Sequence, residues 1–275
     1  FNGNVAELMI ATEYELTGRE RDEVLRLMGR NLEVMKASVL LGLDESKSRS
    51  GLTGGDAAKL HHYIQSGKAL SDHTVLTAAK NAIAVNEHNA KMGLVCATPT
   101  AGSAGCLPAV LTSAIEKLDL TEEQQLEFLL AAGAFGLVIA NNASISGAEG
   151  GCQAEVGSAS AMSAAALVLA AGGSAFQASQ AICFVIKNML GLICDPVAGL
   201  VEVPCVKRNA MGASYAFIAA DMALAGIESK IPVDEVIDAM YQVGSSLPTA
   251  FRETAEGGLA TTPTGRRLSK EIFGE

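Results

Sequence analysis

The stretch VGSASAMSAAALVLAAGGSAFQASQAICFVIKNMLG, residues 156–191, decides the fold class. It carries no charged residue before Lys187 and consists largely of Ala, Ser, Gly and aliphatic side chains. Alanine is the best helix former, so this composition predicts helices, and their small side chains would let them pack closely. Gly172-Gly173 interrupts the pattern, which indicates a hairpin of two helices over 156–171 and 175–191. Because Ser and Gln also interrupt the apolar run, buried core helices fit better than a membrane span of about 20 apolar residues.

The overall composition favours the same fold class. Hydrophobic residues make up 49% of the chain, charged residues 18% and aromatic residues 4%, with no Trp. These values exclude general disorder, and the scarcity of strand-forming side chains favours helices. The uncharged segment 128–148 is also interpreted as a core helix rather than a membrane span. No segment alternates strictly between apolar and polar residues, so we expect a single all-α domain of closely packed, Ala- and Gly-rich helices.

Local signals place further helices along the chain. Thr17 with Glu20, and Thr121 with Gln124, have the spacing of a capping box, in which two side chains satisfy the first N–H groups of a helix. Pro232 suits the first turn of a helix. Helices are expected over 25–39, 59–65, 74–92, 121–140 and 208–226, and onward from Pro232. We divide the domain into an N-terminal helical part (1–50), a core (51–260) and a polar surface tail (261–275).

The charge balance and the first ten residues exclude some classes of protein. Thirty acidic and twenty basic residues give a net charge of −10. This balance argues against a nucleic-acid binder and gives no reason to expect attraction to anionic lipid. Residues 1–10 lack the basic start and apolar run of a signal peptide, so we expect a cytoplasmic protein whose cysteines stay reduced.

Three segments do not resemble ordinary helices or connecting loops. Each is rich in Gly and in small hydroxyl or amide side chains, and each joins two helical regions. Such loops expose backbone N–H groups at helix N-termini, which suit anions such as carboxylates. One loop of this kind would be interpreted as a helix cap or a tight turn, whereas three in one chain indicate a shared site. The segments are CATPTAGSAGC (96–106), NNASISGAEGGCQAEVG (141–157) and CDPVAGLVEVPCVKRN (194–209).

Cys152, Cys194 and Cys205 lie in two of these segments. Pro196 and Pro204 stiffen the loop between the last two cysteines, so both thiols could face one point. Three thiolates are typical of zinc with one open position, or of an iron–sulfur cluster with fewer than its usual four cysteines. The spacing leaves both metals open, since it contains no C-x-x-C pair.

The remaining cysteines and the histidines give weaker signals. Cys183 lies in an apolar helix and is interpreted as a small core side chain, while Cys96 and Cys106 are ambiguous. His61 and His62 are neighbours in a helical stretch, where adjacent side chains point in different directions, so a surface or partly buried pair is favoured over a catalytic one.

Several of these motifs resemble the iron–sulfur-dependent L-serine dehydratases, specifically the α subunit of the two-subunit bacterial form. The resemblance runs from about Gly51 to the C-terminus. It implies conversion of L-serine to pyruvate and ammonia, a [4Fe–4S] cluster with one iron open to substrate, and a β subunit as partner; a homo-oligomer is also possible. The motifs are PTAGSAG (99–105), NASISGA (142–148), GCQAEVG (151–157), CDPVAGLVEVPCVKRNA (194–210) and RETAEGGLA (252–260).

The resemblance also implies roles for residues of this chain. Cys152, Cys194 and Cys205 would hold the cluster. Arg208 and the backbone N–H groups of 98–105 and 142–147 would hold the substrate carboxylate. The candidate substrate-binding side chains are Thr98, Thr100, Ser103, Asn142, Ser144, Ser146 and Arg208.

The catalytic base is the role for which this chain offers no convincing residue. Glu155 and Lys207 are possible, but the family suggests a histidine on the β domain. Single-chain members end in a cysteine that can cover the open iron. This chain ends Ile-Phe-Gly-Glu, so that self-capping is expected to be absent, and its N-terminus is shorter than expected for the α subunit.

Three alternatives to this function stay open at the level of the sequence. A pyridoxal-phosphate lyase could use Lys207 or Lys187 as its Schiff base, with Gly150-Gly151 near the phosphate. A non-catalytic, cluster-bearing sensor or regulatory subunit is the second alternative. The third keeps the chemistry but changes the substrate to threonine or cysteine.

Overall fold

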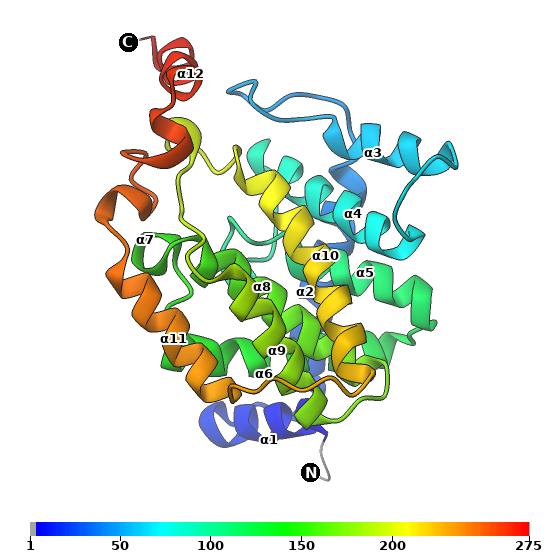
Figure 1. The fold of residues 1–275 in the computed structure, drawn as a ribbon. Coiled ribbons are helices and arrows are strands. Elements are labelled where there is room, and N and C mark those ends of the chain that lie inside the picture. The colour runs from blue at the N-terminus through cyan, green and yellow to red at the C-terminus, as the bar shows by residue number, and fades with distance from the viewer. Residues whose placement is uncertain (1–3, 275) are drawn as a thin grey trace.

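Helix α8 (Cys152–Ala170) forms the centre of the molecule (Figure 1). The computed structural model describes residues 4–274, and every residue of α8 from Cys152 to Val168 is buried. A helix that is apolar and small on all sides must be covered on all sides by other elements. Apart from Glu155 in its first turn, α8 has no charged residue and mostly small side chains, which accounts for its central position.

Two shells of helices surround α8. Helices α5, α6, α9 and α10 pack along α8, and α7 and α11 also contact it. Helix α4 packs outside α5 and α10, with α2 and α3 against α4. Helix α1 packs on α6, and α11 on α9 and α7. The described residues contain no β-strand, which confirms the predicted all-α class. The other helices are α1 (Val5–Thr17), α2 (Arg21–Leu41), α3 (Asp56–Gln65), α4 (His73–Ala90), α5 (Cys106–Leu118), α6 (Glu122–Asn142), α7 (Gly147–Gly150), α9 (Ala175–Met189), α10 (Cys205–Leu224), α11 (Val233–Ser246) and α12 (Pro263–Phe273).

Small residues set the close approach of α8 and α10. The Ser160 hydroxyl donates to the Gly212 carbonyl across the contact, at 2.6 Å. A Cβ atom on Gly212 would lie only 2.8 Å from Cys106 Sγ and 2.9 Å from a methyl group of Val156. Any larger residue at position 212 would push these helices apart, so the glycine fixes their separation.

The predicted hairpin and one of the two predicted capping boxes are confirmed. Helices α8 and α9 flank Gly172, whose φ of +84° ends the first helix, although α8 begins four residues earlier than predicted. Thr121 and Gln124 exchange both hydrogen bonds of the box at the start of α6. The helices predicted over 59–65, 74–92 and 208–226, and the one after Pro232, correspond to α3, α4, α10 and α11.

The capping box predicted at Thr17 and Glu20 is wrong. Thr17 is the last residue of α1, and its hydroxyl donates back to the Glu13 carbonyl at 2.8 Å. Gly18, with a φ of +72°, ends that helix. Glu20 precedes α2 but makes no side-chain hydrogen bond to it. The polar segment 17–20 therefore separates two helices instead of opening one.

Helix α6 contains most of the uncharged segment that is interpreted as a core helix, and the C-terminal segment is expected to be a surface tail. By length and composition α6 could cross a membrane, and 44% of its most apolar window is buried. In the fold it packs against α1, α2 and α8. The segment predicted as a polar tail forms α12, whose residues are mostly exposed. Residues 1–3 and Glu275, which belong to the predicted leader-free start and the tail, lie outside the described residues.

Candidate functional site

The three cysteines of the unusual segments are buried close to one another. Cys152 is the first residue of α8, Cys205 is the first residue of α10, and Cys194 lies in the loop before α10. Burial raises the pKa of the Cys152 thiol to about 12, against the opposing effect of the positive Arg208 guanidinium. Burial also raises the pKa values of Cys194 and Cys205, and negative charge on Cys152 raises both further. The three thiols therefore lie within electrostatic reach of one another.

The hairpin of α8 and α9 explains why Cys194 lies beside Cys152. The chain leaves along α8, returns along α9, and reaches the start of α8 again at residue 192. There the Gln153 N–H donates to the Leu192 carbonyl at 2.9 Å, and the Gln153 side chain accepts from the Gly191 N–H at 2.8 Å. Two cysteines that are 42 positions apart in the sequence thus meet at one end of the hairpin.

The C-terminal segment 249–260 holds the Cys194 loop in place. The Cys194 N–H donates to the Phe251 carbonyl at 2.9 Å, and the Glu253 N–H donates to the Cys194 carbonyl at 2.8 Å. Asp195 accepts from the Leu259 N–H at 2.7 Å. This pairing brings residues from the end of the chain to the cysteines.

Arg208 ties the same loop to α10. Its guanidinium donates to the Ile193 carbonyl at 2.8 Å and forms an ion pair with Asp195 at 2.9 Å. The Arg208 side chain is 18% exposed, so this pair is largely shielded from water. Because Arg208 lies beside Cys152, the buried thiols have a fixed positive group next to them.

Two asparagines hold the glycine-rich loop 98–105 against the cysteine site. Asn209 accepts from the Gly105 N–H at 3.1 Å and donates to the Gly102 carbonyl at 2.8 Å, and Asn86 donates to the same carbonyl at 3.0 Å. A Cβ atom on Gly105 would lie 2.2 Å from Asn86 Oδ1. The loop can approach this closely only because residue 105 has no side chain.

Glu155 lies one turn into α8, on the side of this loop. Its carboxylate accepts a short hydrogen bond from the Thr100 hydroxyl, and a Cβ atom on Gly102 would lie 2.4 Å from Glu155 Oε1. Burial raises the pKa of Glu155, although the Thr100 hydrogen bond lowers it, and the charge of Glu253 raises it further. Glu155 is therefore a buried carboxyl group beside a second carboxylate.

Gly147 marks the point where these groups meet. A Cβ atom built on Gly147 would meet three side-chain atoms at 3.0–3.2 Å: Cys194 Sγ, Glu253 Oε2 and Glu155 Oε2. The missing side chain thus leaves a space faced by one predicted cluster ligand and two carboxylates.

The predicted substrate-binding side chains differ in their surroundings. Thr98, Thr100 and Ser103 belong to the loop beside Glu155, and the Thr100 and Ser103 hydroxyls are 3.0 Å apart. Thr98 is buried, and its hydroxyl donates to the Cys96 carbonyl at 3.5 Å.

The polar side chains of the segment 142–147 make local hydrogen bonds. Asn142 donates to the Val138 carbonyl at the end of α6, and Ser144 donates to the Glu149 carboxylate. Ser146 accepts from the Ala148 N–H and caps α7. These bonds shape the turn that presents Gly147.

The lysines considered as base or Schiff base lie at the surface. Lys207 pairs with Asp56 at the start of α3, and its side chain is 51% exposed. Lys187 donates to the Ser229 hydroxyl at 2.8 Å. Of the two base candidates, only Glu155 faces the cysteine site.

Of the other cysteines, Cys106 also lies within electrostatic reach of Cys152: burial raises the pKa of Cys106, and negative charge on Cys152 raises it further. Cys96, Cys183 and the histidines lie outside this group. Cys183 is buried in α9, as predicted, and Cys106 starts α5 beside Asn209. Cys96 is partly exposed near α2. His61 and His62 lie on α3, His73 starts α4, and His88 packs against Gly93 near the end of α4. None of the four histidines belongs to the three predicted loops.

Sequence reasoning missed Glu253 and the two asparagines as contributors to the site. Glu253 lies in the motif 252–260, but nothing in its spacing connects it to Cys194. The structural signal is the backbone: Glu253 and Ala255 both have positive φ, at 65° and 58°, which is uncommon for non-glycine residues. Asn209 is part of the third segment, yet its role became visible only through its bonds to Gly102 and Gly105.

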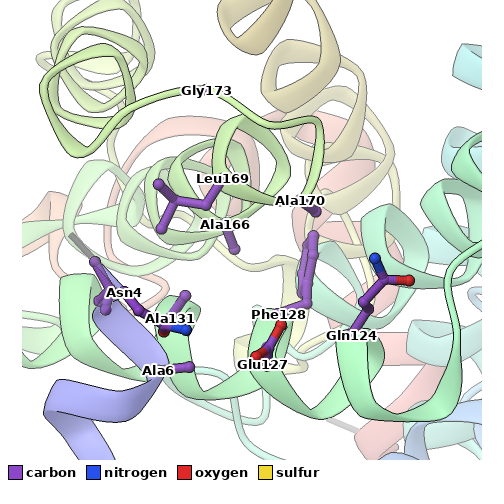
Figure 2. A pocket seen from close by; sticks show the side chains of 11 residues that line it. Asn4, Ala6, Gln124, Glu127, Phe128, Ala131, Ala166, Leu169, Ala170 and Gly173 are labelled. Carbon is purple, nitrogen blue, oxygen red and sulfur yellow. The ribbon is translucent and has the colours of Figure 1, made fainter. Parts of the chain in front are cut away.

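Figure 2 shows a separate pocket of about 310 Å³ among α1, α6 and α8, lined by Ala6, Phe128 and Ala166 among others. None of its lining residues is a predicted site residue. Ala166 is 14 positions from Cys152 along α8, which corresponds to about 21 Å at 1.5 Å per residue. A groove of about 430 Å³ is lined in part by Val156, Met211 and Arg208, so it includes a residue of the cysteine site.

Comparison with known proteins identifies the family of the chain. Residues 2–260 match the family model for the serine dehydratase alpha chain. The probable L-serine dehydratase alpha chain of Bacillus subtilis is 62% identical over 270 residues, covering 98% of this chain and 90% of the relative. The L-serine dehydratase alpha chain of Peptoniphilus asaccharolyticus is 42% identical, covering 98% and 93%. An L-serine dehydratase of Streptomyces coelicolor is 41% identical, but the match covers only 57% of that longer protein. The chain therefore belongs to the serine dehydratase alpha chain family.

Proposed function

We propose that this chain is the cluster-bearing catalytic subunit of an L-serine dehydratase, which converts L-serine to pyruvate and ammonia. The observation that carries the proposal is the meeting of three buried thiols with Arg208 and two carboxylates at the start of α8. The names of the relatives supply the reaction. Serine is favoured over threonine and cysteine on those names.

The cofactor proposed is a [4Fe–4S] cluster held by Cys152, Cys194 and Cys205. Buried thiolates are the soft ligands that such clusters use. Within residues 4–274, no three His, Cys, Asp or Glu side chains are placed to bind a single metal ion. In a cluster each cysteine binds its own iron, so the three thiols need not converge on one point.

When bound, the cluster would supply a Lewis-acidic iron that polarises the substrate hydroxyl. Residues of this chain would supply binding and orientation. The Arg208 guanidinium, fixed by Ile193 and Asp195, offers positive charge for the substrate carboxylate. The N-termini of α8 and α10 add positive partial charge at the same place. The loop 98–105, held by Asn86 and Asn209, would exclude water from one side.

The base that removes the Cα proton would come from a β subunit. A base must come within about 3 Å of the proton that it takes, directly or through one water. The four histidines lie outside the site loops, and Lys207 is paired with Asp56 at the surface. The alpha-chain names of the relatives imply such a partner, and the Streptomyces relative has additional sequence that this chain does not match. We also propose a cytoplasmic location, since all six cysteines are free thiols.

The test is a titration of reconstituted α chain with purified β chain under anaerobic conditions, with pyruvate as the readout. We expect turnover to rise by about 10²–10⁴-fold on adding the β chain, which is the usual contribution of a general acid or base. The β chain alone and a Cys152→Ser α chain are the controls. Full activity of the α chain alone would contradict the assignment of the base to the partner. Absence of pyruvate from the complex would contradict the proposed function.

A further inference from the structure

The Glu155 and Glu253 carboxylates face each other across Gly147 without a matching cation. Oε2 of each lies within 3.2 Å of the position that a Gly147 Cβ would occupy. In residues 4–274 neither carboxylate forms an ion pair within 4 Å, and the nearby Arg208 is paired with Asp195. Two negative groups placed so close disfavour each other unless a positive group lies between them.

Glu155 is aimed at this space by its other contacts. Its side chain is buried, with the whole residue 7% exposed, and its Oε1 atom accepts from Thr100. Its Oε2 atom receives no hydrogen bond from the described part of the chain and points toward Gly147. This oxygen is not among the fully buried polar atoms of the described residues, so solvent reaches it and a donor from a bound ligand can take the place of water there.

Glu253 is held opposite by the backbone. Its N–H donates to the Cys194 carbonyl, and its φ of 65° turns the chain so that the side chain reaches the same space. Cys194 Sγ lies 3.0 Å from the Gly147 Cβ position. The gap between the two carboxylates is therefore adjacent to the proposed cluster, where the substrate would bind.

We propose that Glu155 and Glu253 bind the α-ammonium group of the substrate. The inference rests on the proposed function, because it assigns a subsite within that active site. An ammonium group offers three N–H donors and a positive charge, which match two carboxylate oxygens. Calcium fits less well, because it takes six to eight oxygen ligands and, within residues 4–274, no third carboxylate or histidine completes a metal site here.

This subsite would make the enzyme select 2-amino acids. 3-Hydroxypropionate has the carboxylate and the hydroxyl of serine but lacks the ammonium group. It should therefore use every part of the site except the two carboxylates. Glu256 provides a matched control, because it lies three residues after Glu253 and is exposed.

The experiment uses the reconstituted holoenzyme with its β chain and compares wild type with Glu253→Gln, Glu253→Asp and Glu256→Gln. Binding of L-serine and of 3-hydroxypropionate is measured by calorimetry and by the change each causes in the cluster spectrum. Iron and sulfide per chain verify that each variant holds its cluster. In Glu253→Gln we expect serine affinity to fall about 10- to 100-fold, the range for a lost charged hydrogen bond, while 3-hydroxypropionate affinity changes less than about twofold.

The remaining outcomes separate the two proposals. Glu253→Asp keeps the charge and should retain more serine affinity than Glu253→Gln, and Glu256→Gln should match wild type. Equal loss for both ligands, or equal loss in the Asp and Gln variants, would assign Glu253 a structural role and overturn the inference. Unchanged serine affinity in Glu253→Gln, with normal turnover, would overturn this inference alone. A wild-type holoenzyme that neither binds nor dehydrates serine would overturn the proposed function as well.

Discussion

Replacing Glu87 by glutamine should destabilise the fold, because this buried carboxylate holds the loop before α3. Glu87 is fully buried in α4. Its Oε1 accepts from the Thr53 hydroxyl at 3.3 Å, the Gly54 N–H at 3.1 Å and the Asp56 N–H at 3.0 Å, and its Oε2 accepts from the Ala57 N–H at 3.3 Å. The carboxylate thus satisfies the first N–H groups of α3, which has no side-chain cap of its own.

The magnitude follows from these four hydrogen bonds. In Glu87→Gln one oxygen becomes an amide NH₂ group, so at least one buried N–H faces another donor, at a cost of about 1–3 kcal/mol. The remaining bonds lose the charge of the acceptor, and the start of α3 loses a favourable anion, which contributes about 0.3–1 kcal/mol. The variant no longer desolvates a charged group, which offsets part of this. We expect a net loss of about 2–4 kcal/mol.

The assay is urea denaturation of the α chain, followed by far-UV circular dichroism, with amide hydrogen exchange at residues 54–57. The control is Glu33→Gln, at an exposed position of α2, where a change within about 0.5 kcal/mol is expected. Faster exchange at Gly54 and Ala57 in Glu87→Gln would locate the loss at the loop. A free energy of unfolding equal to that of the control, with unchanged exchange, would refute the reasoning.

Three further predictions concern the site and its supports. Serine in place of any of the three proposed cluster ligands should reduce iron and sulfide per reconstituted chain to background, whereas Cys183→Ser should keep both; full occupancy in a ligand variant would remove that cysteine from the set. Gly105→Ala should lower the free energy of unfolding by about 1–3 kcal/mol in urea titrations, because its Cβ would lie 2.2 Å from Asn86 Oδ1. An unchanged urea midpoint would show that the loop can shift to accept the methyl group. Burial raises the pKa of Asp56, but hydrogen bonds from Lys207 and a second lysine outweigh it and lower the pKa from 3.8 to about 2. Asp56 therefore stabilises the fold above pH 3.8 and loses this contribution as the pH falls toward 2. Lys207→Met should remove part of that acid dependence, by less than about 1 kcal/mol because the Lys207–Asp56 pair is exposed. A steeper loss of stability with falling pH in the variant would contradict the expected direction of this effect.

The helices of the core could be predicted because their signals are local. The α8–α9 hairpin follows from an uncharged, Ala-rich stretch broken by glycine, and the start of α6 follows from the Thr121 capping box. The boundary between α1 and α2 could not be predicted from spacing, because Gly18 ends the first helix within a polar segment that has the spacing of a cap. Helix α12 has a mostly polar sequence, which favoured a surface tail, although Thr262 caps it and its few apolar residues, Leu268 and Ile272 among them, follow a helical period.

The site was predictable only in part, because its parts meet through tertiary structure. The motifs identified the cysteines as a group, but only the return of α9 to the start of α8 places Cys194 beside Cys152. Glu253 reaches the site through backbone pairing with Cys194, almost 60 residues earlier in the chain, and no periodicity encodes such a contact. The family resemblance implies that Ser144 and Ser146 bind substrate, and in the structure their hydroxyls also hold the turn at Gly147. Polar residues in a glycine-rich loop can hold the loop itself, and sequence alone does not separate the two roles.

The arrangement of α8 and α10 gives the site its electrostatic polarity. Cys152 and Cys205 start the two helices, and Ser160 and Gly212, eight and seven residues later, are in contact. The helices therefore run side by side in the same direction, with both N-termini at the thiols, so their positive ends stabilise anions there. Glu155, in the first turn of α8, and Glu253, in the C-terminal segment, introduce negative charge beside the same space, next to Gly147. A zwitterionic amino acid would then be oriented by both of its charges, with the carboxylate toward the helix N-termini and Arg208 and the ammonium group toward the two glutamates. Because Arg208 lies on α10 and Glu253 in the C-terminal segment, these two anchors would align the substrate along the line between them, which would restrict the direction of its Cα proton toward the proposed base.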